Sequence, residues 1–559
     1  MRPKTSTADC LKPLLKGEQK MKHKKSSQTI HNDAKLSENK SDPIEFTDIV
    51  GGIGRWQVML LLTTLLSGLP IAWNHLGMAF LAFPVDHWCA RPNGMNESLE
   101  TWFADYLPNE KTEGKLQHSQ CEMFALNQST AEVDRTKTVP CNTWEFSTGY
   151  YSLIEEWHVV CSRDWMLSTS QSVYMLGFLA AVLVSGQIAD LYGRHPTMML
   201  NIVILLVAGM AAAFANSFLV FTIFRFFIAF GHAGIGLVIY VLFIETLGSQ
   251  YRAYYVFLHG FGWHIGYVLL PLIAWWLKNW FYLQLFMTIP CALFFLYYWI
   301  VPESPRWLLS KGKLDKAIPI LELAAKMNKK DVKDLETQAK KICFLENEEG
   351  NKASKASVLD LLRTPNLRMK TLILYFVWMT IAFTYYGLSL NTNALQGNDY
   401  LNFFLSGLME IPATIFCMLT LDRFGRKKPF IFTLMVGGLS CFGFVFVPES
   451  APGIKKSLAM AGKLFVSASF TIVYVYSAEI FPTVARNAGI GSSSTIARIG
   501  SAIAPFMRDL GNVTSPAVPL GIFGGLSVIS ALLVIKLPET NTFPVPETLE
   551  QAENFGKKT

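Results

Sequence analysis

Residues 186–196 read GQIADLYGRHP, and residues 421–429 read LDRFGRKKP. Both loops place an Asp three residues before a Gly-Arg pair, which is followed by a basic residue and a Pro. Each loop comes after the second apolar stretch of its half of the chain, so the sequence contains an internal duplication. Matched repeats of this kind are typical of membrane transporters, in which the substrate site lies near the midplane between the repeats.

The apolar stretches of the chain predict its fold class. Each is close to the roughly 20 residues that a helix needs to cross a bilayer. They are long and continuous, which favours helices over the short alternating strands of a membrane barrel. We therefore predict an all-α polytopic membrane protein with twelve transmembrane helices in two six-helix halves. The predicted spans are 56–83, 166–189, 197–215, 218–244, 254–277, 280–301, 370–391, 400–421, 430–448, 459–479, 487–509 and 517–536.

The hydrophilic segments predict the domain organisation and the orientation. The 302–369 loop holds fourteen Lys or Arg, whereas the 85–165 loop holds thirteen Asp or Glu against six Lys or Arg. Because basic segments collect on the cytosolic side, we expect both termini in the cytosol of a plasma-membrane protein and the 85–165 loop outside. The predicted segments are a basic cytosolic tail (1–55), an N-terminal half (56–301), a cytosolic loop with one or two short helices (302–369), a C-terminal half (370–536) and a cytosolic tail (537–559).

The 85–165 loop has two further features of an extracellular domain. It contains glycosylation sequons at Asn96 and Asn127 and four of the nine cysteines. Four cysteines in an oxidising compartment predict two disulfides, for which three pairings are open. These cysteines are Cys89, Cys121, Cys141 and Cys161.

Composition excludes several classes of protein. With 51% hydrophobic and only 16% charged residues, the chain has too little charge for a soluble multi-domain enzyme and too many apolar residues for a disordered protein. The net charge of +7 is not gathered into one basic surface, so nucleic acid is not an expected partner. The sequence lacks a phosphate-binding loop, zinc-ligand spacing and a nucleophile set, so we expect no enzyme, no ATP-driven pump and no metal. The expected partners are the bilayer and a small organic ion; no cofactor is expected, although Na⁺ and H⁺ stay open as coupling ions.

Several motifs resemble one known family. The repeated loop is similar to the signature Gly-x-x-x-Asp-Arg-x-Gly-Arg-Lys of the major facilitator superfamily, and PESPRWL (302–308) is similar to a motif of sugar and organic-ion porters. The 85–165 loop, entered through FPVDHWCARP and left through EWHVVCSRDW, resembles that of the organic cation, carnitine and organic anion transporter family. Residues 473–506 and 546–551 look most like its carnitine-type branch. The resemblance covers nearly the whole chain from residue 50 onward.

The resemblance implies that the two repeated loops form gates at the cytosolic ends of the helices. The first copy departs from the signature, with Leu191 in place of Arg and His195 in place of Lys, which would loosen that gate or make it pH-sensitive. Glu245 and Glu479 are each followed by an Arg seven residues later, and we predict gate salt bridges with Arg252 and Arg486. The other predicted gate residues are Asp190, Gly193 and Arg194 in the first half and Asp422, Arg423, Gly425 and Arg426 in the second.

Arg498 is the first candidate for binding substrate. It lies in the middle of the predicted span 487–509, on a stripe of small and polar residues. A charged side chain inside the bilayer is costly and usually faces the bundle interior. By resemblance, Arg at this position occurs in the carnitine-type and organic-anion branches, where it would hold a carboxylate bidentately. A buried structural ion pair is the alternative.

Glu410 is the second candidate, in the predicted span 400–421, with Ser406 and Thr414 one turn away on either side. It would attract a cationic head group, a proton or Na⁺. Alternatively, it would pair with an Arg from another span. The sequence leaves these alternatives open.

Other residues inside the spans have predicted roles in coupling, packing or substrate contact. Arg225 and His232 share a face of the predicted span 218–244, and we predict a coupling or packing role for them. Asn74 resembles an Asn of the family's first span, and His259 and His264 are interpreted as histidines satisfied by neighbouring helices. Aromatic faces hold quaternary ammonium groups, although lipid anchoring or packing is the alternative for any one Tyr. The further substrate-contact candidates are Tyr385, Tyr386, Asn391 and Tyr474.

Together these features predict a secondary active transporter of small organic ions that works by alternating access. Because Arg498 would hold an anion and Glu410 a cation, the predicted substrates are zwitterions or organic cations, carnitine-like or betaine-like. One alternative is an organic anion transporter or exchanger, in which Glu410 is structural. Another is a non-transporting membrane receptor on a transporter fold.

Overall fold

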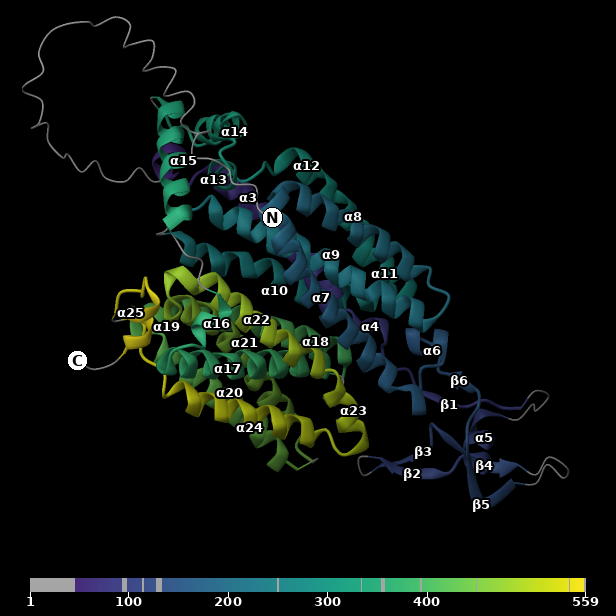
Figure 1. Ribbon diagram of the computed structural model, residues 1–559. Helices are drawn as coiled ribbons and strands as arrows, with labels where there is room; N and C mark the ends of the chain where they lie inside the picture. Colours follow the sequence, from purple (N-terminus) through teal and green to yellow (C-terminus); the bar gives the residue numbers. More distant parts are fainter. Residues whose placement is uncertain are drawn as a thin grey trace, which may run out of the picture.

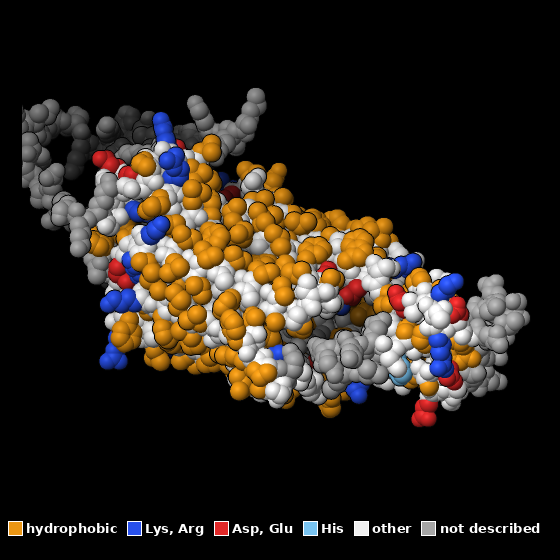
Figure 2. Space-filling model, turned by 90° about the horizontal axis from the view of Figure 1, so that it is seen from below, with side chains coloured by type: hydrophobic (Ala, Val, Ile, Leu, Met, Phe, Trp, Pro, Cys, Tyr) orange, Lys and Arg blue, Asp and Glu red, His pale blue; other side chains and the backbone are white. Residues whose placement is uncertain are grey.

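The structure, a computed structural model, consists of two helical bundles and a small domain that extends from one end of them (Figure 1). Eleven helices of the described residues are long and apolar enough to cross a membrane. Apolar side chains cover the helical body, and Lys, Arg, Asp and Glu gather at its two ends (Figure 2). The described residues are 46–92, 98–112, 115–126, 133–248, 251–332, 334–352, 357–392, 395–448, 450–541 and 543–556.

The N-terminal bundle contains the first six predicted spans. Two of them are interrupted: the first ends its regular helix at Leu76 and resumes after Gly77, and the sixth passes through a 3-10 segment. The short helix α2 (Phe46–Val50) precedes the bundle. The helices are α3 (Arg55–Leu76), α4 (Met78–Leu81), α7 (Trp165–Tyr192), α8 (Arg194–Ala213), α9 (Phe218–Glu245), α10 (Arg252–Leu277), α11 (Trp280–Thr288), η3 (Ile289–Leu296) and α12 (Tyr297–Ile300).

The C-terminal bundle contains the other six predicted spans, of which 487–509 differs from expectation. The helix α22 ends at Ile503, and the chain passes Pro505 before α23 begins, because proline has no N–H to continue the helical hydrogen bonds. Its polar composition leaves α22 outside the eleven apolar helices. The elements are α17 (Pro365–Leu390), α18 (Asp399–Leu408), α19 (Glu410–Phe424), α20 (Lys427–Gly443), η5 (Phe444–Phe446), α21 (Pro452–Ile480), η6 (Thr483–Ala485), α22 (Arg486–Ile503), α23 (Phe506–Val513) and α24 (Ala517–Val534).

Local sequence signals place several helix ends. The helices α17 and α21 begin with Pro365 and Pro452, where the missing proline N–H has no intrahelical partner to lose. Ser217 caps α9 by accepting a hydrogen bond from Val220 N. The helix α7 ends at Gly193, whose φ of +122° is open to glycine and strained for other residues.

Short helices lie at the end of the bundles that carries residues 46 and 556. The cytosolic loop, for which one or two short helices were predicted, contains two over Leu314–Met327 and Leu335–Lys352. Asn328, just after the first of them, accepts a hydrogen bond from Trp56 N and donates to Val50 O, which fixes this segment to the start of α3. These helices are α13 (Pro305–Ser310), α14 (Leu314–Met327), α15 (Leu335–Lys352), α16 (Val358–Leu361) and, near the C-terminus, α25 (Leu549–Asn554). We call this end the inner end.

The 85–165 segment forms a disulfide-linked domain at the opposite, outer end. The disulfides are Cys89–Cys141 and Cys121–Cys161, which selects one of the three open pairings. Its strands form three two-stranded antiparallel sheets, which the all-α prediction did not include. Asn96 and Asn127 lie outside the described residues. The elements are β1 (His87–Cys89), α5 (Leu99–Tyr106), β2 (Asn109–Thr112), β3 (Lys115–His118), β4 (Glu122–Leu126), β5 (Val133–Pro140), β6 (Trp144–Phe146), α6 (Leu153–Trp157) and η1 (Cys161–Arg163).

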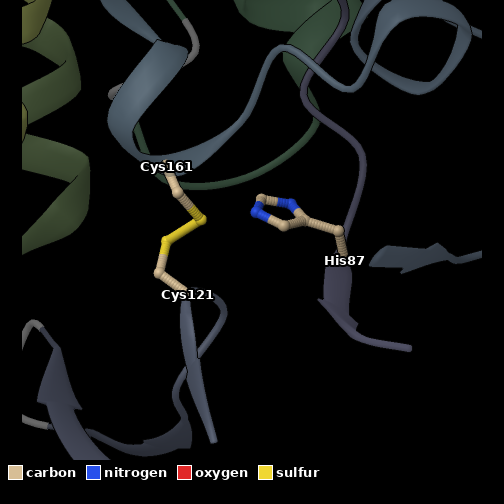
Figure 3. Close-up of side chains that lie close together, drawn as sticks. All are labelled: His87, Cys121 and Cys161. Carbon is tan, nitrogen blue, oxygen red and sulfur yellow. A yellow bond between two sulfur atoms is a disulfide. The ribbon is translucent and has the colours of Figure 1, made fainter. Parts of the chain in front are cut away.

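His87 of this disulfide domain points toward the Cys121–Cys161 disulfide (Figure 3). Its ring and the two sulfur atoms form the group of potential metal ligands found in the described part of the chain. Burial lowers the pKa of His87 below its usual value, so the ring is neutral near pH 7. The sulfurs are bonded to each other, however, and metal binding by cysteine requires thiolates. This cluster is therefore not a metal site in the oxidised protein.

The two bundles meet at their outer ends. The helix α7 contacts α22 and α23, and α10 contacts α18 and α19. Asp164 and Arg508 form an ion pair of 2.9 Å between the bundles, and Ser172 Oγ donates to Ala502 O. Toward their inner ends the bundles diverge in Figure 1. The outer side is therefore the closed side in this conformation.

Candidate functional site

The first repeated loop forms an ion-pair network at the inner end of the N-terminal bundle. Arg194 donates to Glu245 Oε1 at 2.8 Å and lies 2.9 Å from Asp190. The carboxylate of Glu303 accepts from the N–H groups of Arg194 and His195, at the start of α8. A carboxylate is stabilised at this position because the N-terminus of a helix carries free N–H groups and a partial positive charge.

The second repeated loop forms the same network in the C-terminal bundle. Arg426 donates to Glu479 Oε1 at 3.0 Å and lies 3.6 Å from Asp422. Glu539 accepts from Arg426 N at 2.9 Å, as Glu303 does in the first half. Gly425 ends α19 with a φ of +81°, as Gly193 ends α7. The duplication seen in the sequence is thus a duplicated ion-pair network at the inner ends of the two bundles, where the gates were predicted.

The sequence prediction missed two residues of these networks and paired one glutamate with the wrong arginine. Glu303 and Glu539 were not predicted, although each follows a proline directly after the last span of its half, in PES and PET. The predicted pair of Glu479 with Arg486 is wrong: Glu479 accepts from Arg426, whereas Arg486 donates to Thr483 Oγ1. Glu245 likewise bonds Arg194, and the side chain of Arg252 lies outside the description. Arg423 is exposed beside Phe424, apart from the network.

Arg498 lies on α22 where the two bundles meet. Its Nη1 donates to the Tyr386 hydroxyl at 3.4 Å, and its guanidinium carbon lies 4.1 Å from the ring centre of Phe178 in the other bundle. Only 8% of the residue is exposed. Within the described residues its Nε has no hydrogen-bond partner, and no carboxylate pairs with it. The alternative of a buried structural ion pair is therefore not what the described residues form.

Aromatic rings from both bundles surround this arginine. The ring of His75 on α3 stacks on Tyr386 at 5.5 Å and meets Phe178 and Trp263 edge-on at 4.9 and 5.4 Å. We call Phe178, His75, Trp263 and Tyr386 the aromatic box. Rings in this arrangement bind flat or apolar groups and also attract cations through their faces.

Glu410 is fully occupied by protein partners. Its carboxylate accepts from the Tyr385 hydroxyl at 2.5 Å, from Lys463 Nζ at 2.9 Å and lies 2.8 Å from His264 Nδ1. Of the open alternatives, the structure therefore favours pairing with a cation from another span, which is a lysine and not an arginine. His264 bonds α19 through both ring nitrogens, which confirms that neighbouring helices satisfy it.

Lys463 was missed by the sequence reasoning. It lies in α21, is 1% exposed, and donates to Ser389 Oγ at 2.6 Å in addition to Glu410. Its ammonium also lies 3.5 Å from the ring centre of Tyr385. The signal that could have found it is its place as a single cation within the apolar run 459–479, which is costly unless it is paired.

Arg225 and His232 lie deeper in the N-terminal bundle. Arg225 is fully buried, with Gln171 accepting from its guanidinium and the ring of Tyr174 at 4.5 Å. Neither nitrogen of His232 has a partner among the described residues. The described centre thus holds three cations, Arg225, Lys463 and Arg498, against the one carboxylate of Glu410, and its charge balance is positive.

The other predicted contacts are scattered. Asn74 donates to Pro70 O at 3.0 Å within its own helix, and its Oδ1 is unpaired among the described residues. Tyr474 packs edge-on against Trp378 at 4.4 Å inside the C-terminal bundle. Asn391 lines a cavity of about 1670 Å³ between the disulfide domain and the outer helix ends, which Lys463 and Gln171 of the centre also line. Tyr385 and Tyr386 are the predicted aromatics that lie at the centre.

Comparison with known proteins agrees with this arrangement. Residues 114–552 match the family described as "Sugar (and other) transporter". The chain is 38% identical over 517 residues to an organic cation transporter protein of Drosophila melanogaster, covering 91% of this chain and 94% of the relative. It is 33% identical to solute carrier family 22 member 3 of Rattus norvegicus, covering 90% and 94%, and to member 13 of Homo sapiens, covering 90% and 92%.

Solved structures share the fold at lower sequence identity. The inward open conformation of the xylose transporter XylE from E. coli matches with a TM-score of 0.59 and 16% identity, over 90% of this chain and all of that one. A structure of the same protein, described as a major facilitator superfamily proton:xylose symporter, matches with a TM-score of 0.57. The chain therefore belongs to the sugar (and other) transporter family of the major facilitator superfamily, in the group of organic cation transporters and solute carrier family 22 members, and is a multi-pass membrane transporter and not an enzyme.

Proposed function

We propose that this protein is a secondary active transporter that moves small organic anions, held by a carboxylate on Arg498, across the plasma membrane. The observation that carries the proposal is the buried guanidinium of Arg498, which has a free Nε and no carboxylate partner among the described residues. A guanidinium presents its N–H groups in a planar fork that matches a carboxylate. The outer end faces the extracellular side, and both termini are cytosolic.

Charge balance is the reason for preferring anions over the zwitterions and cations expected from the sequence. A cationic head group at Glu410 would have to displace Lys463, which lies 2.9 Å from that carboxylate. Breaking a buried ion pair costs about 3–5 kcal/mol, which the contact between Glu410 and the cationic head group would have to offset. An organic anion needs no such exchange, because Arg498 is not neutralised. The names of the relatives refer to organic cations, so cation transport is the direct competitor.

A zwitterion is the second candidate, and the aromatic box favours it. The Tyr386 hydroxyl lies 3.4 Å from Arg498 Nη1, and the ring of His75 stacks on Tyr386. A trimethylammonium group held by these rings would lie near a carboxylate bound to Arg498. Such cation–π contacts contribute about 0.5–2 kcal/mol each. This route to a zwitterion leaves Glu410 with Lys463.

The arrangement of the two bundles supports alternating access. Arg498 contacts Phe178 of the opposite bundle, so a substrate bound there touches both halves. Closure at the outer end through Asp164 and Arg508 leaves the inner end as the exit. The opposite conformation would break these outer contacts and bring the two inner gates together.

Uptake of three matched probes into expressing cells tests the substrate class. The probes are 5,5-dimethylhexanoate, its trimethylammonium analogue 4-(trimethylammonio)butanoate, and butyltrimethylammonium, which share one shape and differ in charge. We expect saturable uptake of the anion, weaker uptake of the zwitterion and none of the cation. Arg498→Gln should lower anion uptake at least about tenfold, equivalent to losing about 1.4 kcal/mol from a charge-assisted hydrogen bond.

Two controls make this result specific. Arg163→Gln removes the same charge from an exposed position of the disulfide domain and should leave uptake unchanged at equal surface expression. Saturable uptake of the cation alone, unaffected by Arg498→Gln, would refute the proposal. Saturable binding of the anion to purified protein without any uptake would instead identify the non-transporting receptor.

A further inference from the structure

A buried hydrogen-bond cluster joins the two bundles at mid-membrane depth. His264 lies in the middle of α10, where Gly262 and Gly266 pack directly on the backbone of α3 at Leu65 and Leu69. The side chain of His264 reaches α19 of the C-terminal bundle. Its Nδ1 lies 2.8 Å from Glu410 Oε2 and its Nε2 lies 2.9 Å from Thr414 Oγ1.

The hydrogen atoms in this cluster can be counted. The Thr414 hydroxyl has one hydrogen, and it donates to the backbone carbonyl of Glu410 at 3.1 Å. In this arrangement Thr414 Oγ1 accepts from His264, so Nε2 carries a hydrogen; when the hydroxyl instead turns to donate to Nε2 at 2.9 Å, that nitrogen is an acceptor. The 2.8 Å contact between Nδ1 and Glu410 Oε2 needs a hydrogen as well, on the imidazole or on the carboxyl group. With Thr414 bonded to the carbonyl, the pair holds one proton more than a neutral histidine beside a carboxylate, whereas with Thr414 bonded to Nε2 it does not.

We propose that His264 and Glu410 form a proton-binding site between the two halves of the transporter, and that the bound proton favours the conformation with a closed outer end. The proposal rests on the alternating access of the proposed function. When the proton leaves to water, Nδ1 faces Oε2 without a hydrogen, or Thr414 gives up its bond to the carbonyl. Either change removes the extra proton, so the His264–Glu410 contact that crosses between the bundles loses its charge-assisted character and becomes weaker. The weaker contact favours separation of the bundles.

The groups that face His264 are few among the described residues. Glu410 on α19 is the one charged group in direct contact, and through it Lys463 on α21 and Tyr385 on α17 join the cluster. Other titratable groups around α10 have different contacts. On α10 itself, Tyr267 bonds Ser406 of α18; on α3, His75 contacts Trp263; and Asp399 of α18 lies at the outer end. Lys463 Nζ, 2.9 Å from Glu410 Oε1, stabilises this carboxylate in its ionised form.

Access to the outer interface, measured without substrate, tests the proposal on the purified full-length protein. Ser172 is 8% exposed between α7 and α22, so Ser172→Cys is protected from a thiol reagent while the outer end is closed. Labelling rates are divided by those of Leu359→Cys, whose parent side chain is 76% exposed, because thiolate reactivity itself rises with pH. We expect the corrected rate to be at least about threefold lower near pH 5.5 than near pH 8.

Three variants in the Ser172→Cys background test whether His264 causes this pH dependence of labelling. His264→Gln should remove it, whereas His259→Gln should retain it, because His259 on the same helix contacts Tyr240 of its own bundle. Thr414→Val removes the acceptor of Nε2 and should shift the pH at which the labelling rate changes to a lower value. This variant also tests the proposal if His264→Gln does not purify in a folded form. The same pH dependence in His264→Gln as in the parent, or a parent rate independent of pH, overturns the proposal.

The labelling experiment tests the proton site and the uptake experiment tests transport, so either proposal can be refuted without the other. Labelling that depends on pH through His264, together with absence of uptake for every probe, would keep the proton site and remove the proposed transport. Saturable anion uptake with labelling that ignores His264 would do the reverse. If both hold, anion uptake should depend on pH in the parent and lose that dependence in His264→Gln.

Discussion

Gly193 shows how one residue fixes the inner gate of the N-terminal bundle. Its φ of +122° is strained for residues with a side chain, and an added Cβ would lie 2.3 Å from Glu303 Oε2. Gly193→Ala would therefore strain the backbone and push away the carboxylate that caps α8 through Arg194 and His195. We expect a loss of about 1–3 kcal/mol of stability, measured as a lower Tm of the purified protein.

Gly149 provides the control for this substitution. Its φ is +149°, and an added Cβ would meet nothing within 4 Å. Gly149→Ala therefore imposes backbone strain without a steric clash, in the disulfide domain and away from the gate. If the two substitutions lowered Tm equally, displacement of Glu303 would have no role in the cost.

The residues of the centre could be predicted in part. Arg498, Glu410 and Arg225 stand out because charge within an apolar span is costly, and all three lie in the bundle interior. Their partners did not follow from the sequence, since pairing depends on which faces of α17, α19 and α21 meet. Glu410 and Lys463 are 53 positions apart, and helical periodicity does not relate residues on different helices. The charge balance, and with it the preference for anions, therefore required the structure.

At the scale of elements, the short helix α25 acts as a cap for the long helix α17. The carboxylate of Glu553 accepts from Asn366 N at 3.0 Å and Leu367 N at 2.8 Å, in the first turn of α17. Lys370, 4% exposed, donates in return to the carbonyls of Ala552 and Phe555. Each helix thus satisfies backbone groups that the other leaves free at its terminus.

Glu553→Gln tests this capping. The substitution keeps one acceptor oxygen but removes the negative charge at the positive end of the α17 dipole, so we expect a loss of about 1 kcal/mol. The measurement is the Tm of the purified protein, compared with Glu550→Gln, which removes an exposed carboxylate from the same short helix. A Tm unchanged by Glu553→Gln, or lowered as much by Glu550→Gln, would mean that α25 does not stabilise α17 in this way.

The transmembrane helices could be predicted from the sequence better than any other elements, because their length and apolar character are local properties. Pro505 alone could have predicted the interruption of the span 487–509. We predicted one continuous span because the polar stripe around Arg498 runs through this stretch. The strands of the disulfide domain were missed because most are three to five residues long. The strands whose burial is described are mainly exposed or half-buried. Such strands depend on pairing and on the disulfides, which alternation of apolar residues does not reveal.

At the scale of the whole molecule, the two inner gates lie within single bundles, whereas the outer contacts and the central cluster lie between bundles. Arg194 and Glu245 belong to one half, and Arg426 and Glu479 to the other. In the proposed alternating access, these pairs would keep each bundle rigid. Asp164 with Arg508 and His264 with Glu410 connect the halves, so they would change as the bundles move. The position of the conformational equilibrium should therefore respond to the second group of contacts.

Asp164→Asn tests this division at the outer end. The Asp164–Arg508 pair is about one-third exposed, 28% and 34% for the two side chains. A partly exposed ion pair contributes about 0.5–1 kcal/mol, so losing it should raise the population with an open outer end about two- to fivefold. Labelling of Ser172→Cys should accelerate by that factor at low salt, and less near 1 M salt, where screening weakens the pair in the parent. Asp86→Asn, an exposed substitution in the same outer cavity, should leave labelling unchanged. Equal labelling of Asp164→Asn and its parent at low salt would mean that the Asp164–Arg508 pair does not contribute to closing the outer end.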